Sequence, residues 1–320
     1  MFNNRNNMKY NIALIGAHNM VASNILKAIA ELYNNYNKIF ALSRSEFMGK
    51  KISFGDNEVL VIDDFHNFDF SKIDLVIICD LCIKPTELDR LLSHDLTIID
   101  LGVLSSVKNS SLGIFDVNNT NYNKRIFVPT PFVSAIGLLL SSINNIYDVN
   151  RVNATILNSV SNFEKEGMDE LYNQTKSKFM QSEIEHSVFD KQIAFNILLK
   201  EDQSALEQIQ SICKNDVAIS VAQFISPVFI GDIIALHMEF DSEIDLEELK
   251  EIIAENTWFS FVQNITPIDT VNESTICISN IDYSDKNRSK KAIHITMMLD
   301  NLFMGYGVNI VEILKSITSK

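Results

Sequence analysis

The chain has 320 residues, which is long enough for two domains or one large domain with a substantial hydrophobic core. Apolar residues make up 46% of it and charged residues 21%, as is ordinary for a globular protein. The formal net charge of −14 argues against nucleic acid and anionic membrane surfaces as partners, because both carry negative charge themselves.

The composition also argues against export and against metal binding. Residues 1–9 are polar and lack the apolar centre of a signal peptide, and no apolar run approaches the roughly 20 residues that span a bilayer. We therefore expect a cytoplasmic protein. Cys79 and Cys82 form a lone CxxC pair, and a zinc site would need a second pair. Together with Cys213 and Cys277 they are too scattered for a disulfide framework.

A strand, a glycine and a helix follow one another near the start of the sequence. Residues 10–15 are an apolar run typical of a buried strand, and after Gly16 apolar residues recur at helical spacing. This order is typical of the first βα unit of a dinucleotide-binding domain, where a helix N-terminus faces a phosphate. The complete fingerprint has three glycines, but the chain has only Gly16, with Asn19 and Ala22 at the other two positions. The candidate cofactor-binding residues here are Gly16, Asn19, Met20 and Val21.

Three polar residues, Ser43, Arg44 and Ser45, follow a second predicted strand over residues 38–42. The end of the second strand is where the adenine ribose lies in such a domain, and an arginine there can bind the 2′-phosphate of NADP. A solvated loop arginine is the alternative interpretation. The sequence leaves both open.

The remaining elements up to residue 128 alternate between strands and helix. Strands are predicted over residues 74–79, 96–100 and 126–128, a helix over 85–93, and a hairpin over 49–63. The alternation indicates a Rossmann-like, doubly wound parallel sheet, in which the hairpin is an insertion.

A second domain is predicted after Pro129 and Pro131. An apolar helix over residues 135–147 leads to the alternating strand 151–160, which is typical of an antiparallel sheet with one solvated face. Further helices are predicted over 167–178, 202–214 and 245–255, strands over 217–221, 227–240, 274–279 and 292–299, and a final helix over 305–317. We expect a dinucleotide-binding-like domain over residues 1–130, to which the C-terminal helix 302–320 returns. Residues 131–301 then form an α+β domain with a mixed or antiparallel sheet.

These motifs, in their order and spacing, resemble the aspartate-semialdehyde dehydrogenase family, and most closely its divergent USG-1-like branch. The resemblance rests on residues 12–26, 43–45, 54–61, 73–80, 98–100, 159–175, 192–198, 226–232 and 299–314. It implies a nucleotide-binding domain and a second domain that forms a homodimer and carries the catalytic residues. Active members oxidise an aldehyde through a cysteine thiolate, with a histidine as proton relay, NADP as hydride acceptor and phosphate as acyl acceptor.

Carried over position by position, the resemblance places these roles on residues that lack the chemistry. The nucleophilic cysteine matches Val133, and the glutamine that orients the substrate matches Asn158. The arginine that binds the substrate carboxylate matches Ile225, and the histidine matches Asp232. The glycine-rich segment matches residues 162–164.

Substitutes for the lost groups are few. The second arginine, which binds phosphate, falls near Ser106 or Lys108 without a firm placement. Ser134 lies beside the nucleophile position, but a serine needs an adjacent base. Asp232 could accept a proton, although a histidine is better matched to neutral pH. His237 and His294 lie in predicted strands and are expected to be core or surface histidines.

Two hypotheses follow. In the first, the chain is a non-catalytic homodimeric relative that acts as a binding or structural protein. In the second, it is an oxidoreductase that binds NADP through Gly16 and Arg44 and acts on an aldehyde with altered or residual chemistry. The hypotheses differ in whether Phe132, Phe163 and Ile225 fill the former substrate space, because a small anion cannot enter an apolar interior without an unpaired charge.

Overall fold

The structure is a computed structural model. It describes residues 9–56, 58–80, 83–102, 110–115, 117, 122–144, 146–202, 204–213, 217–285 and 289–318. The chain forms two compact units, one of Met1–Pro129 with Tyr306–Lys320 and one of Thr130–Gly305. The predicted fold class, a Rossmann-like parallel sheet and a second unit with a mixed sheet, is confirmed.

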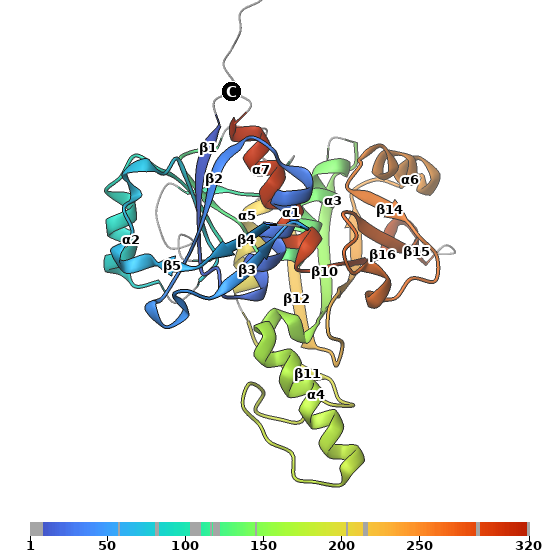
Figure 1. Ribbon diagram of the computed structural model, residues 1–320. Helices are drawn as coiled ribbons and strands as arrows, with labels where there is room; N and C mark the ends of the chain where they lie inside the picture. The colour runs from blue at the N-terminus through green and yellow to red at the C-terminus, as the bar shows by residue number, and fades with distance from the viewer. Residues whose placement is uncertain are drawn as a thin grey trace, which may run out of the picture. The chain divides into compact units, whose positions relative to one another are not determined.

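The first unit is built on a seven-stranded sheet with the order β5-β2-β1-β6-β7-β9-β8, in which every pairing is parallel (Figure 1). Its strands are β1 Tyr10–Ile15, β2 Tyr36–Ser43, β5 Asp63–Asp64, β6 Leu75–Ile78, β7 Thr97–Asp100, β8 Ser111–Leu112 and β9 Arg125–Phe127. The chain passes from β1 to β2 on one side and later to β6 on the other. The carboxyl ends of β1 and β6 therefore form the switch point at which ligands bind in this class of fold.

Among the described residues of this unit, three α-helices cover the sheet. They are α1 Met20–Leu32, α2 Pro85–Leu92 and α7 Asn309–Thr318, with short 3-10 turns at η1 Ser45–Phe47, η2 Phe65–Asn67 and η3 Phe70–Lys72. Leu88 and Leu91 of α2 join the apolar cluster on the face that carries Ala13 and Ile15. The predicted hairpin insertion is confirmed as β3 Lys51–Phe54 and β4 Glu58–Val61. Of the apolar residues predicted to face inward from α1, Leu32 is 37% exposed at the helix end.

The last helix packs on α1, and the Tyr33 hydroxyl donates a hydrogen bond to Thr318 Oγ1 at 3.2 Å. The predicted continuous helix over 305–317 is wrong at its start, where Phe303–Val308 is π-helical before α7. The Gly305 N–H bonds the Asp300 carbonyl five residues back. A Cβ at Gly305 would lie 2.4 Å from the Pro131 side chain, so only glycine fits there.

The second unit is built on a mixed sheet with the order β11-β12-β10-β13-β16-β15-β14. Its strands are β10 Val149–Asn158, β11 Leu198–Lys200, β12 Ala218–Ile225, β13 Asp232–Phe240, β14 Phe259–Phe261, β15 Ile276–Asp285 and β16 Ser289–Leu299. The antiparallel environment predicted for residues 151–160 is correct on one side only, because β10 pairs antiparallel with β13 and parallel with β12. Alternating burial reports which face is solvated and carries no information on strand direction.

The helices of this unit are α3 Pro131–Ile143, α4 Glu164–Met180, α5 Ser204–Ile212 and α6 Leu246–Glu255, with 3-10 turns η5 Val160–Phe163 and η6 Pro267–Thr270. The helix predicted over 135–147 begins and ends four residues earlier. Pro131 occupies its first turn, where the missing N–H has no intrahelical partner to lose. Asp245 caps α6, since its side chain accepts from the Glu247 and Glu248 N–H groups; the sequence by itself leaves Ser242 and Asp245 as alternatives for this cap.

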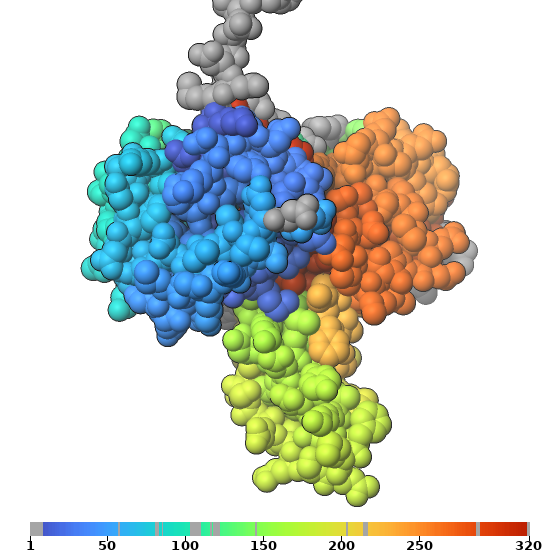
Figure 2. Space-filling model, in the orientation of Figure 1, coloured from blue at the N-terminus to red at the C-terminus, as the bar shows by residue number. Residues whose placement is uncertain are grey.

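Helix α4 projects beyond the ends of β10 and β12 (Figure 1), whereas β11 pairs with the end of β12. Figure 2 shows the segment of α4 and β11 in yellow-green as a lobe of this unit. Among the residues that the structure describes, no helix combines the length and apolarity that crossing a membrane requires.

Candidate functional site

At the switch point in the first unit, Gly16 is in close contact with the backbone of Asp80. Gly16 follows β1 with a φ of +87°, and a Cβ there would lie 2.8 Å from the backbone nitrogen of Asp80, which follows β6. Only glycine tolerates both conditions. The approach of Asp80 is therefore sufficient reason for the glycine, without any bound phosphate.

The N-terminus of α1 is occupied by the chain itself. Asn19 caps the helix, because its Oδ1 accepts from the Ala22 N–H at 2.8 Å, while its Nδ2 donates to the Cys79 carbonyl at 2.9 Å. Met20 and Val21 are half-buried in the first turn. A phosphate at a helix N-terminus needs free N–H groups, and the Asn19 side chain takes one of them.

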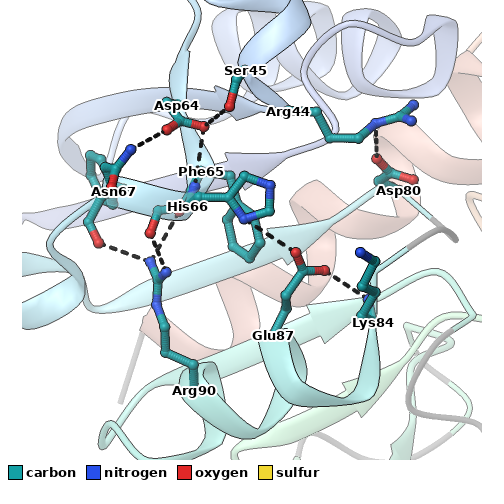
Figure 3. Close-up of polar contacts among 11 residues, drawn as sticks. Arg44, Ser45, Asp64, Phe65, His66, Asn67, Asp80, Lys84, Glu87 and Arg90 are labelled. Atoms are coloured by element: carbon teal, nitrogen blue, oxygen red, sulfur yellow. Dashed lines mark hydrogen bonds and ion pairs between the residues drawn. The ribbon is translucent and has the colours of Figure 1, made fainter.

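The two serines after β2 are also engaged by neighbouring side chains. The Ser43 hydroxyl lies 2.7 Å from Nδ1 of His18, and the Ser45 hydroxyl donates to Asp64 Oδ1 at 2.9 Å. Figure 3 shows the second of these bonds. Ser43 is 1% exposed, so its hydroxyl faces the interior.

Arg44 lies between two carboxylates. Its Nε is 3.7 Å from Asp80 Oδ2, and its Nη1 is 3.5 Å from Glu46 Oε1. The guanidinium also lies 5.6 Å from the centre of the Phe47 ring. Figure 3 shows Arg44 and Asp80 facing each other at the edge of the site. The charge that a 2′-phosphate would need is thus already compensated.

A cavity of about 90 Å³ lies beside this ion pair. Its apolar walls include Ile15, Phe65 and Ile83, and Glu87 at its rim lies 3.2 Å from Nδ1 of His66. Arg90 donates to the Phe65 and Phe68 carbonyls at 3.0 Å each, which fixes the turn that carries Phe65 (Figure 3).

Taken together, the residues at this end of the sheet do not fit NADP. Gly16 packs against the backbone of Asp80, and the Asn19 side chain caps its own helix. Arg44 forms ion pairs with two carboxylates. The structure brings the predicted cofactor-binding residues together, but each of the polar ones bonds to another part of the chain.

The positions that match catalytic residues lie in the second unit and are all buried. Val133 is 0% exposed in the first turn of α3, and Phe132 beside it is 1% exposed. The Ser134 hydroxyl is buried, and no residue that the structure describes forms a hydrogen bond with it. No described base is therefore in reach to activate it.

Asn158 and Ile225 are paired at the ends of β10 and β12. The Asn158 amide donates to the Phe224 carbonyl at 3.0 Å. Ile225 belongs to an apolar cluster with Phe189, on which the Phe163 ring packs at 4.9 Å between centres. Apolar side chains thus pack against the residue that matches the carboxylate-binding arginine.

An open groove of about 660 Å³ borders Phe163 and Ile225. The cation nearest to β12 in its lining, Lys200, forms an ion pair with Asp202 at 3.6 Å. Lys200 is thus already paired with a carboxylate. Its ammonium group also lacks the planar fork of N–H donors by which an arginine binds a carboxylate.

Asp232 is enclosed in a buried polar network at the start of β13. Its Oδ1 accepts from the Ser159 N–H at 2.8 Å, the Ser159 hydroxyl at 2.9 Å and the Asn162 amide at 2.9 Å. Burial raises the pKa of the Asp232 carboxyl to about 6, against the opposing effect of these hydrogen bonds. Asp232 is 0% exposed, and its Oδ1 faces this network.

The glycine-rich position at the start of α4 is strained. Glu164 has a φ of 58° and a ψ of −160°, a region that is essentially restricted to glycine. Such a conformation costs on the order of 1–3 kcal/mol and persists only where the surrounding structure enforces it. Glu164 thus adopts a glycine-type conformation within the segment 162–164, which the resemblance matches to a glycine-rich stretch.

The other candidate groups give no alternative centre. Cys79, Cys213 and Cys277 are buried outside disulfides, and burial raises the pKa of the Cys213 thiol to about 11. Cys82, Ser106 and Lys108 lie outside the described residues. No cluster of three metal-ligating side chains occurs in the described part of the chain. His237 and His294 are cross-strand neighbours that bond to Ser284 and Asn280, as expected of surface histidines.

Sequence reasoning missed Asp80 and the polar network of Asp232. Asp80 could have been found from its position directly after the buried strand at the switch point, where parallel strands present their carboxyl ends. Asn301, whose Oδ1 accepts the Gly231 N–H at 3.1 Å and the Ser161 hydroxyl at 3.1 Å, carried no such signal.

Comparison with known proteins places the chain among dehydrogenases. A family model described as "Semialdehyde dehydrogenase, dimerisation domain" matches residues 140–304. The chain is 31% identical to an aspartate-semialdehyde dehydrogenase of Rickettsia bellii, over 95% of this chain and 96% of the relative. It is 23% identical to a USG-1 protein homolog of Pseudomonas aeruginosa, over 76% and 77% of the two chains.

The fold is similar to a solved structure of aspartate semialdehyde dehydrogenase II from Vibrio cholerae. The TM-score is 0.90 at 20% sequence identity, with 98% of this chain and 99% of the other covered.

Proposed function

Because this chain belongs to the aspartate-semialdehyde dehydrogenase family, we propose that it has lost the thiolate-dependent, NADP-linked oxidation of aldehydes. It acts instead as a non-catalytic, homodimeric binding or structural protein. The observation that carries this proposal is Val133, a fully buried branched hydrocarbon at the position that matches the nucleophilic cysteine. Covalent catalysis needs a lone pair on that side chain, and valine has none.

The surroundings of Ile225 and Asp232, which match two other catalytic positions, support the same conclusion. Ile225 cannot bind a substrate carboxylate, and the apolar cluster around it would leave such an anion without a counter-charge. Asp232 holds the turn at Ser159 and Asn162 and presents no oxygen to a substrate. Ile225 and Asp232 thus have roles in packing and hydrogen bonding in place of the chemical ones.

The alternative, an oxidoreductase that transfers hydride directly to NADP, would need Arg44 for the 2′-phosphate and the α1 N-terminus for the diphosphate. The ion pairs of Arg44 and the cap formed by Asn19 oppose it. No observation on the described residues favours this second function.

We propose that the homodimer forms through the second unit. Its projecting lobe carries large apolar side chains that are well exposed, among them Phe179 at 78%, Phe195 at 66% and Leu199 at 63%. Exposed apolar patches of this kind mark interaction surfaces. Sedimentation equilibrium is expected to return twice the 36.3 kDa of one chain, and a monomer mass at micromolar concentration would contradict the proposal.

Loss of activity is tested by incubating the purified chain with aspartate semialdehyde, phosphate and NADP while the absorbance of reduced cofactor is followed. No rate above that of buffer is expected, whereas the Rickettsia bellii relative serves as positive control. The variant Val133→Cys is also expected to be inactive, because Asp232 and Ile225 remain. A rate that scales with wild-type concentration and vanishes in Asp232→Asn would refute the proposal.

A further inference from the structure

We infer that Asp80 excludes 2′-phosphorylated nucleotides from the switch point, because its carboxylate lies 3.7 Å from Nε of Arg44, the residue that would bind the phosphate. This inference concerns the first unit, whose sheet has the fold of a dinucleotide-binding domain. It does not depend on whether the chain is catalytic, so each proposal can fail without the other.

The two carboxylates beside Arg44 differ in how firmly they face it. The Asp80 side chain is 12% exposed, whereas the Glu46 side chain is 62% exposed. Asp80 therefore lies on the enclosed side of the guanidinium, toward the cavity, and Glu46 lies on the solvent side. An ion pair that is partly shielded from water is screened less than an exposed one, so Asp80 is the stronger competitor of a phosphate.

The backbone holds Asp80 in place. The Cys79 N–H donates to the Ile15 carbonyl at 2.8 Å, and the Cys79 carbonyl accepts from Asn19 at 2.9 Å. Asp80 itself packs against Gly16, where even a Cβ would be too close. The backbone of Cys79, which directly precedes Asp80, is thus held on both sides, to β1 and to the cap of α1.

The neighbouring charges add to this effect. Asp64, which bonds Ser45, and Glu87, at the cavity rim, are further carboxylates at the same end of the sheet (Figure 3). A phosphate monoester brings close to two negative charges at neutral pH. A phosphate bound by Arg44 would lie beside the Asp80 carboxylate, only 3.7 Å from the same guanidinium, and the two like charges would repel each other.

The test compares the binding of adenosine 2′-monophosphate and adenosine by titration calorimetry. In Asp80→Asn, which keeps the shape of the side chain and removes its charge, adenosine 2′-monophosphate is expected to bind at least tenfold more tightly than in the wild type. Adenosine, which lacks the phosphate, is expected to gain less affinity than adenosine 2′-monophosphate does. The double variant Asp80→Asn/Arg44→Gln is expected to lose the gain, because the phosphate then has no guanidinium to bind.

The matched control is Glu46→Gln, which removes the exposed carboxylate from the same arginine and is expected to change the affinity less than threefold. An equal gain in Glu46→Gln would overturn the inference, since net charge alone would then account for it. The absence of a gain in a folded Asp80→Asn, as judged by thermal unfolding, would also overturn it. Should Asp80→Asn not fold, Asp80→Ser is measured in the same way and decides the question by the same criteria.

Discussion

Replacing Asp232 with alanine is expected to lower the free energy of unfolding by about 3 kcal/mol. The substitution leaves the Ser159 N–H, the Ser159 hydroxyl and the Asn162 amide without their acceptor in a buried site. Each buried donor that loses its partner costs about 1–3 kcal/mol, and relief of the buried negative charge offsets part of the sum. Urea unfolding at pH 7, monitored by circular dichroism, measures the change.

The matched variant Asp232→Asn keeps an acceptor oxygen and removes the charge, and is expected to cost less than about 1 kcal/mol at pH 7. A loss as large as that of the alanine variant would mean that the charge, rather than the hydrogen bonds, stabilises this turn. Restoring the family's histidine at this position is expected to destabilise the fold as well, because the larger ring must enter a closely packed polar site.

The pH dependence of the same pair of proteins tests the raised pKa of Asp232. The folded-state pKa, about 6, lies above the ordinary value of 3.8, so the folded protein binds a proton more tightly than the unfolded chain does. Stability from this group is therefore fully present below pH 3.8 and is lost as the pH rises through 6. From pH 7 to pH 5 the wild type is expected to gain about 1 kcal/mol relative to Asp232→Asn. An unchanged difference over this range would show that Asp232 is not perturbed.

Replacing Glu170 with alanine is expected to destabilise the second unit by about 3–5 kcal/mol, the largest effect that we predict. The Glu170 carboxylate is 4% exposed on α4 and accepts from the Ser187 N–H at 3.0 Å, the Ser187 hydroxyl at 2.9 Å and the Gln174 amide at 2.8 Å. It also accepts from the Val188 N–H. The segment after α4 thus takes its backbone hydrogen bonds from one side chain, and truncation leaves several buried donors unpaired.

Hydrogen exchange gives a local measure of the same effect. The amides of residues 187–189 are expected to lose most of their protection in Glu170→Ala, while amides of β10 keep theirs. The control is Glu166→Ala on the exposed face of α4, where a surface substitution is expected to change stability by less than about 0.5 kcal/mol. Protection that persists in Glu170→Ala would contradict the anchoring role.

Acid is expected to act on Glu170 in the opposite direction from Asp232. Burial raises the pKa of Glu170, but the hydrogen bonds from Val188 and Ser187 outweigh it and hold the pKa below its ordinary value of 4.5. A carboxyl with a lowered pKa stabilises the fold above that value and loses its contribution as the pH falls below it. The difference between wild type and Glu170→Gln is therefore expected to shrink below about pH 4.5.

Much of the fold was accessible from sequence pattern because the relevant interactions are local. Apolar runs, the helix face of α1 and the cap at Asp245 depend on neighbours within a few residues, and the structure contains each of them. The sequence pattern did not predict the boundaries of α3, nor that β10 has one parallel and one antiparallel neighbour. A proline stops a helix or starts one depending on what precedes it, and strand direction depends on chain connections elsewhere.

The sequence by itself determined that no thiolate stands at position 133, since valine lacks a nucleophilic atom in any conformation. Only the tertiary structure decided the roles of Arg44 and Asp232. Arg44 meets a carboxylate that lies 36 positions away and follows a strand separated from its own by β1. Asp232 meets donors that lie 73 and 70 positions away. Whether an ionisable group is available for chemistry depends on the solvation and partners it has after folding, and those come from segments remote in the chain.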